Sequence, residues 1–141
     1  MEKNRGFTLV ELVITMGVLA VLLGATVLII NPVAQFSNAR NSERRNHINT
    51  IINAIKQNAA DHRGIFTCSD GPIPTSTTVL GTNGYDINGC IAPDYIAVLP
   101  MDPLTGTSND IGYSIVNDVI TGRITITGDD AELGKTITVT R

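Results

Sequence analysis

Glu11 has the most unusual chemical setting in the chain, because it is the only charged residue between Gly6 and Ile30. From Leu12 to Ile30 there are 19 consecutive residues without a charge. At about 1.5 Å of helical rise per residue, this run spans most of a bilayer core of about 30 Å. A carboxylate in hydrocarbon costs about 2.5–3.5 kcal/mol on insertion scales. Glu11 therefore needs either a cationic partner or a shallow position from which it reaches water.

A cut between Gly6 and Phe7 would supply that partner, because the new α-amine would lie four residues upstream of Glu11. The amine could neutralise Glu11 in its own chain or in a neighbouring one. The basic leader, Met1–Arg5, favours a cytoplasmic amino end. An ordinary secretory signal is the alternative, since Ser37-Asn38-Ala39 has the small residues that such a cleavage site requires. The apolar run, however, is longer than a typical signal and contains Glu11.

The string G-F-T-L-V-E-L, residues 6–12, resembles the class III signal of type IV prepilins and type II secretion pseudopilins. In that family a prepilin peptidase cuts after the Gly and methylates the new amino-terminal Phe, and the Glu acts in assembly. The resemblance implies that Gly6 and Phe7 are the processing site and that Glu11 acts with Phe7 in assembly. It further implies a pilin-like fold, a homo-oligomeric helical filament and an inner-membrane assembly platform as a partner.

Pro32 follows the apolar run and predicts a helix break, because proline lacks an N–H and disfavours helix in the preceding residue. A second helical stretch is expected over residues 31–63. Its apolar stripe consists of Ile48, Ile51, Ile52, Ile55 and Ala59. Extended backwards, the stripe meets the polar residues Arg44, Asn41 and Ser37. We therefore expect the far half of this helix to pack on a core and the near half to be exposed.

The near half is also basic, because it contains Arg40, Arg44 and Arg45. Residues 34–63 have a net charge of +3 and residues 64–141 a net charge of −6. The three arginines either form a solvated face, meet lipid headgroups or meet the acidic domain of a neighbouring subunit. The acidic distal domain argues against nucleic acid as its main partner, since phosphate binding requires clustered cations.

Residues 64–141 predict a turn-rich region followed by an antiparallel sheet. Strands are expected at Thr77–Leu80, Ile111–Val116, Arg123–Thr127 and Thr136–Thr140. In the last two strands apolar residues alternate with Thr, so the apolar side chains should face the helix. These are Ile124, Ile126, Ile137 and Val139. The predicted class is α+β: a leader (1–6), a membrane helix (7–30), an amphipathic helix (31–63) and a loop-plus-sheet region (64–141).

Cys68 and Cys90 are the only cysteines. If the distal domain lies outside the cytoplasm, we expect a disulfide, which would contribute about 3 kcal/mol by closing its loop. The alternative is two reduced structural thiols. Asp102, Asn109 and Asp110 are weak calcium candidates, because related pseudopilins bind calcium in a loop of this region. Their spacing matches no EF-hand, and such residues in turns usually bond the backbone. We therefore assign no cofactor.

The segment Leu99–Pro103 reads L-P-x-D-P, a string that resembles the major pseudopilins and several other pilins. It continues as L-T-G, whereas the secretion pseudopilins usually show Trp-Gly there. We expect a filament subunit that first lies in the cytoplasmic membrane with its amino end inside and then reaches the cell surface. A type II secretion or competence pseudopilin and a membrane-anchored binding module are the alternatives. No catalytic constellation is evident, so an enzyme is not expected.

Overall fold

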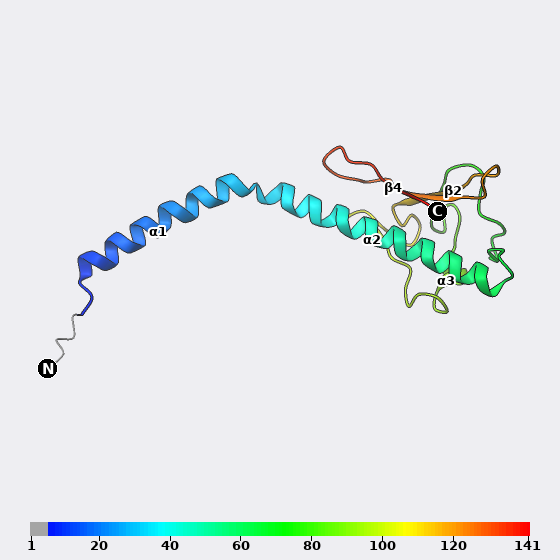
Figure 1. Ribbon diagram of the computed structural model, residues 1–141, viewed down its shortest axis with the longest axis horizontal. Coiled ribbons are helices and arrows are strands. Elements are labelled where there is room, and N and C mark those ends of the chain that lie inside the picture. The colour runs from blue at the N-terminus through cyan, green and yellow to red at the C-terminus, as the bar shows by residue number, and fades with distance from the viewer. Residues whose placement is uncertain (1–5) are drawn as a thin grey trace. The chain divides into compact units, whose positions relative to one another are not determined.

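The structure is a computed structural model that describes residues 6–141 (Figure 1). Most of the expected leader, residues 1–5, lies outside the described residues. The elements in chain order are α1 (Leu9–Ile30), α2 (Pro32–Asp61), β1 (Thr78–Val79), α3 (Asn88–Ile91), β2 (Tyr113–Asn117), β3 (Ile124–Gly128) and β4 (Ile137–Thr140). The chain divides into two compact units between Phe36 and Ser37, inside α2.

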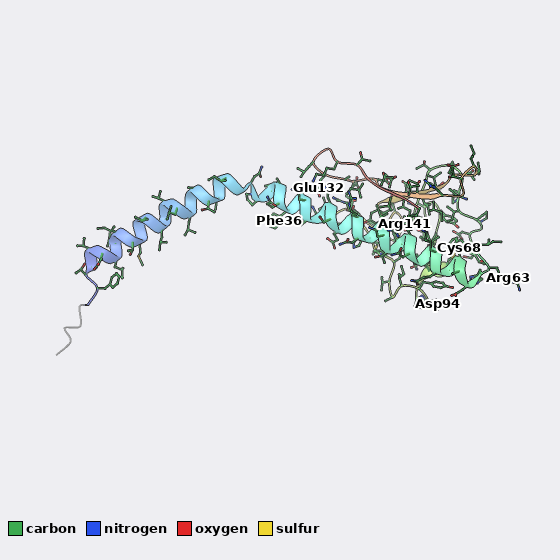
Figure 2. The ribbon with its side chains drawn as sticks, viewed as in Figure 1. Phe36, Arg63, Cys68, Asp94, Glu132 and Arg141 are labelled. Atoms are coloured by element: carbon green, nitrogen blue, oxygen red, sulfur yellow. A yellow bond between two sulfur atoms is a disulfide. The ribbon has the colours of Figure 1, made fainter. Side chains whose placement is uncertain are left out.

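The first unit consists of α1 and the start of α2. The stretch Leu9–Val27 is long and apolar enough to cross a membrane, and all of its side chains are exposed. In Figure 2 the side chains of α1 accordingly project without other segments packed on them. The helix ends at Asn31, which has a left-handed backbone with φ of 45°. Asn31 Oδ1 accepts a hydrogen bond from the Ala34 N–H at 3.3 Å, and Pro32 opens α2, where its missing N–H costs nothing.

The second unit is an antiparallel sheet with the strand order β1-β2-β3-β4, covered on one face by α2. Ile115 pairs with Ile126, and Ile126 pairs with Val139, so apolar residues align across three strands. The fully buried isoleucines of the predicted helix stripe belong to the same core as these strands. They are Ile48, Ile51, Ile52 and Ile55. The predicted α+β fold, a long helix packed on a small antiparallel sheet, is confirmed.

The strands also present the predicted faces. Ile126 and Ile137 are buried, and Ile124 and Val139 pack against the core at partial exposure. The opposite face of β3 and β4 bears hydroxyl pairs: Thr125 with Thr140 at 2.9 Å and Thr127 with Thr138 at 3.3 Å. Cross-strand threonine pairs of this kind stabilise a solvent-facing sheet surface without apolar burial.

The expectation that the near half of the amphipathic helix would be exposed is wrong. Ser37 and Asn41 are buried, and the Arg44 side chain is completely inaccessible to solvent. These residues continue the isoleucine stripe towards the helix start, as the backward extension predicted. The polar positions are nevertheless buried, because partners from distant loops cover them. Of the three expected surface arginines, only Arg45 is exposed, because Arg40 is half-buried and Arg44 is buried.

Candidate functional site

The predicted processing site lies immediately before the first helical turn. Gly6, Phe7 and Thr8 have no regular secondary structure, and the Phe7 ring is exposed. Exposed, non-helical chain at the end of an element is where proteolytic cleavage occurs most readily. The Gly6–Phe7 peptide bond is therefore placed where an enzyme can reach it without unwinding α1.

Glu11 lies in the first turn of α1 and takes part in a capping box. Thr8 Oγ1 accepts a hydrogen bond from the Glu11 N–H at 3.2 Å, and the Thr8 N–H donates back to Glu11 Oε2 at 3.3 Å. Two N–H groups that have no helical partner are satisfied in this way. The carboxylate also sits at the positive end of the helix dipole. The string that resembles a prepilin signal is thus also a T-x-x-E helix start.

This arrangement directs the Glu11 carboxylate towards the residues that immediately precede α1. Its Oε2 atom contacts the N–H of Thr8, the residue directly after Phe7. No cationic side chain lies within ion-pairing distance of Glu11 among residues 6–141. Within this described part of the chain the carboxylate therefore has hydrogen bonds but no countercharge.

Residues 1–27 match the family model described as the prokaryotic N-terminal methylation motif. The chain carries this prepilin-type motif. A motif of this kind is the class III signal of type IV prepilins and pseudopilins, and it covers only the first 27 residues of the chain. No curated protein and no solved structure matches the chain.

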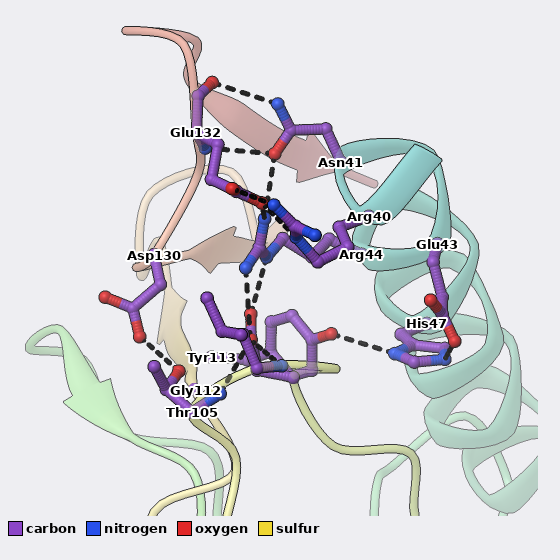
Figure 3. Close-up of polar contacts among 12 residues, drawn as sticks. Arg40, Asn41, Glu43, Arg44, His47, Thr105, Gly112, Tyr113, Asp130 and Glu132 are labelled. Atoms are coloured by element: carbon purple, nitrogen blue, oxygen red, sulfur yellow. Dashed lines mark hydrogen bonds and ion pairs between the residues drawn. The ribbon is translucent and has the colours of Figure 1, made fainter. Parts of the chain in front are cut away.

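The second unit, residues 37–141, is the globular unit of the chain, and it is organised around a buried guanidinium, Arg44 (Figure 3). Arg44 Nε donates to Asp102 Oδ2 at 2.6 Å, and Nη2 donates to Oδ1 at 3.1 Å. Its Nη1 donates to Glu132 Oε2 at 2.8 Å and to Asn41 Oδ1 at 3.0 Å. A planar guanidinium suits this two-pronged contact with a carboxylate. The network thus joins α2 to the loop after Leu99 and to the loop between β3 and β4.

Glu132 receives a second arginine at the edge of the network. Arg40 Nε donates to its Oε2 at 2.7 Å, and Arg40 Nη2 donates to its Oε1 at 2.5 Å. Ser37 Oγ donates to the same Oε1 at 3.0 Å. Asn41 pairs with the Glu132 backbone in both directions, at 2.9 and 3.0 Å. One carboxylate thereby fixes two turns of α2 against the β3–β4 loop.

The pKa directions follow from these contacts. Hydrogen bonds from Arg40 and Arg44 hold the pKa of Glu132 far below its ordinary value. Burial alone would raise the pKa of Asp102, but Arg44 and two backbone N–H groups hold it below its ordinary value. The hydrogen bond to Asp102 raises the pKa of Arg44. All three groups are therefore charged at neutral pH, and each buried charge is paired.

The proposed calcium residues are engaged in other contacts. Both carboxylate oxygens of Asp102 are taken by Arg44, and Oδ1 also accepts from the N–H groups of Leu104 and Thr105. Asn109 Oδ1 accepts from Thr82, and Asp110 Oδ1 accepts from the Gly112 N–H. No group of three or more His, Cys, Asp or Glu in the described part of the chain could hold a metal ion. The residues present do not fit calcium, because Asp102 already neutralises a guanidinium.

Cys68 and Cys90 form a disulfide with a Cα–Cα distance of 5.1 Å. The bond closes the turn-rich segment that contains β1. Asn58, buried near the end of α2, bonds both flanks of this segment: its amide donates to the carbonyls of Thr67 and Cys90 at 3.2 and 2.9 Å. The loop is consequently attached to α2 by hydrogen bonds as well as closed on itself.

Sequence reasoning missed two features of the site. The capping box of Thr8 and Glu11 was detectable, because T-x-x-E before an apolar run is a recognised helix start. Glu132 was not singled out, because a lone acid in a turn resembles any solvated residue. The indirect signal was the charge asymmetry between residues 34–63 and 64–141, which the Glu132 and Asp102 pairs partly explain.

Proposed function

We propose that this protein is a structural subunit of a type IV pilus-like helical filament. The observation that carries the proposal is the match of residues 1–27 to the methylation motif together with the exposed apolar surface of Leu9–Val27. An apolar surface of that length is stable only in lipid or against other apolar helices. The bilayer covers it before assembly, and the corresponding helices of other copies cover it in the filament. The role is structural rather than catalytic.

In this proposal prepilin peptidase cuts between Gly6 and Phe7 and methylates the Phe7 amine. The amine then neutralises Glu11 of a neighbouring copy. Away from water a charge without its partner is costly, so a subunit inserted out of register is disfavoured. The exposed position of Phe7 and the lack of a countercharge for Glu11 among residues 6–141 support this step. The inner-membrane assembly platform would add subunits one at a time.

The test compares Glu11→Ala with Glu11→Asp and the wild type in cells that form the filament. We expect Glu11→Ala to be cut normally, with mature protein starting at Phe7, and to be lost from sheared filaments by at least about tenfold. Glu11→Asp should retain part of the incorporation, because it keeps the charge on a shorter side chain. Normal filament yield from Glu11→Ala would contradict the assembly role. Mature protein starting at Arg40 would indicate a secreted soluble domain instead.

A pseudopilin of a type II secretion or competence system is the second candidate. It is supported by the resemblance of Leu99–Pro103 to the major pseudopilins, although the continuation L-T-G differs from the Trp-Gly that the secretion pseudopilins usually show. A pseudopilin would form short filaments confined beneath the cell surface. Electron microscopy of sheared filaments, with mass spectrometry of their main subunit, distinguishes the two: long surface filaments made of this chain support the pilus.

A further inference from the structure

Two exposed aliphatic residues form the tip of the turn between β2 and β3. Val119 and Ile120 are 72% and 91% exposed. The turn is nevertheless firmly built: Asp118 Oδ1 accepts from the Ile120 N–H at 2.9 Å, and the Gly122 N–H donates to the Asp118 carbonyl at 2.7 Å. A rigid apolar projection loses little conformational freedom when a partner covers it. Val119 and Ile120 are called the apolar tip below.

The same unit has an apolar pocket of about 230 Å³ in the segment between β1 and β2. Leu99 and Ile111 line it and are buried, whereas Val98 and Met101 line it and are exposed. A cavity of about 150 Å³ holds a benzene molecule, so this pocket has room for a branched side chain such as that of Ile120. The globular unit thus has both an exposed apolar tip and a pocket large enough for it.

The tip and the pocket lie at opposite ends of β2. Ile111 of the pocket precedes the strand by two residues, and Val119 of the tip follows it by two. The five residues of the strand span about 16 Å at about 3.3 Å per residue, so the tip is held away from the pocket of its own copy. A contact between tip and pocket therefore joins two copies head to tail. Repeated contacts of this kind form a ring or an open helix rather than a two-fold dimer.

The charges beside the two parts are opposite. Arg123 follows the tip by three residues, and Asp86 lines the pocket. Among residues 6–141, neither has an oppositely charged side chain within 4.0 Å. The carboxylate of Asp118 accepts from N–H and hydroxyl groups of its own turn, whereas a second acid, Asp70, adjoins Asp86 and accepts from its N–H at 3.1 Å. These charges favour the approach of the tip of one copy to the pocket of another.

We propose that the apolar tip of one copy inserts into the apolar pocket of a second copy of this chain, with Arg123 of the first copy facing Asp86 of the second. The inference rests on the proposed filament, in which covering the apolar surface of Leu9–Val27 brings copies side by side. The contact is small and adds to those of the apolar helices, so it need not hold two copies together by itself. Each subunit in an open helix then uses both its tip and its pocket.

The first test reverses the two charges in cells that form the filament. Asp86→Lys alone and Arg123→Glu alone place like charges opposite each other, so each should reach sheared filaments at least about tenfold less than wild type. Co-expression of the two variants should restore both in equal amounts, because each finds its complement only in the other. Mass spectrometry of the filaments measures the two amounts.

The apolar part is tested by Ile120→Ser, which should lower incorporation by about tenfold because the isoleucine is no longer buried on assembly. Ile65→Ser is the matched control, since Ile65 is 71% exposed and lies outside both the tip and the pocket, and it should incorporate as the wild type does. All these variants should keep the wild-type midpoint of urea unfolding, which separates loss of the contact from loss of the fold.

A second test needs no filament. Isotope-labelled Asp86→Lys protein, as the full chain in uncharged micelles, is titrated with unlabelled Arg123→Glu protein and, as the control, with unlabelled Asp86→Lys protein. We expect the backbone amide signals of Val98 and Met101 to shift in nuclear magnetic resonance spectra with the first titrant only. Equal shifts with both titrants, or shifts with neither, would overturn the proposal.

The two tests keep this inference distinguishable from the proposed function. If wild type forms no filament, the proposed function fails and the micelle titration decides the contact. If Glu11→Ala is lost from filaments while Ile120→Ser and both charge reversals incorporate normally, the filament stands and the contact is overturned. Co-expression that restores neither charge variant would also overturn it.

Discussion

Glu11 and Arg44 present the same electrostatic problem in two regions of the molecule. Each is a charge on a helix: Arg44 is buried in the protein interior, and Glu11 lies in the stretch Leu9–Val27, which is apolar and long enough to cross a membrane. Arg44 has its countercharges within the chain, because Asp102 and Glu132 reach it from distant loops. Among residues 6–141, Glu11 has only the N–H and hydroxyl groups of Thr8. The buried charge of the globular unit thus has its partners in the same copy, whereas the described residues supply no countercharge for the carboxylate of the apolar helix.

The largest expected effect comes from removing the guanidinium of Arg44, the charge whose partners lie in the same unit. Arg44→Met should lower the free energy of unfolding of the globular unit by about 3–5 kcal/mol, since it leaves Asp102 buried without a partner. Urea denaturation of the full chain in uncharged micelles, followed by tyrosine fluorescence, measures this loss. Tyr113 is a suitable probe because it is fully buried.

The adjacent exposed arginine is the matched control, and Arg45→Met should change the free energy of unfolding by less than about 0.5 kcal/mol. Glu11→Ala should likewise leave the unfolding of the globular unit unchanged, although it abolishes assembly in the proposed function. Equal losses from Arg44→Met and Arg45→Met would show that the buried pairs do not stabilise the unit.

The next largest effect concerns the disulfide of the globular unit. Cys68→Ser/Cys90→Ser should lower the free energy of unfolding by about 3 kcal/mol. Without the bond, the unfolded chain regains the conformational freedom that linking two residues 22 positions apart removes. The same urea titration measures it, with wild type under reducing conditions as the control. Reduced wild type and the double variant should unfold at the same midpoint. A midpoint unchanged from oxidised wild type would contradict the prediction.

Gly112 tests how closely the network is packed. Its φ is +80°, and a Cβ there would lie 2.6 Å from the Cβ of Asp102. Gly112→Ala should therefore cost about 2–3 kcal/mol from backbone strain and displacement of Asp102. Gly134→Ala is the control, because Gly134 has a similar φ of +64° with open space around it, and it should cost only about 1 kcal/mol. Equal costs would mean that Asp102 can move without loss.

The smallest effect is the contribution of Glu132 to the pH dependence of the free energy of unfolding. Because Arg40 and Arg44 depress its pKa below the ordinary 4.5, the folded state binds this proton more weakly than the unfolded state does. The resulting stabilisation is present above the ordinary pKa and is lost as the pH falls below it. Glu132→Gln should therefore lose less stability than wild type between pH 7 and pH 3 in urea titrations. Asp94→Asn removes a carboxylate outside the ion pairs, so this variant should lose as much stability between pH 7 and pH 3 as the wild type does.

Much of the fold could be predicted because its signals are periodic and local. The uncharged run indicates α1, the Ile48–Ile55 stripe indicates the core face of α2, and the Ile–Thr alternation indicates β3 and β4. The Gly6–Glu11 string likewise identified the motif that the family comparison supports. These features depend only on neighbours along the chain.

The near half of α2 could not be predicted in the same way. Hydrophobic periodicity treats Ser37, Asn41 and Arg44 as surface positions, although they lie on the buried stripe. The burial of Arg44 depends on Asp102 and Glu132, which lie 58 and 88 residues further along the chain. Ser37 and Asn41 likewise bond Glu132. A single sequence contains no local record of such a pairing, and only the opposite net charges of the two segments point to it.

The distance in sequence between Arg44 and its partners has a consequence for biogenesis. Before Asp102 and Glu132 arrive, an unpaired Arg44 keeps its stretch of helix hydrated, because burying a lone charge is too costly. Closure of the domain on this part of α2 must therefore wait until nearly the whole chain, up to the β3–β4 loop, has emerged. A product that lacks the β3–β4 loop has no Glu132 and leaves Arg44 without one of its two carboxylate partners. Burial of this part of α2 is therefore coupled to the synthesis of a loop 88 residues further along the chain.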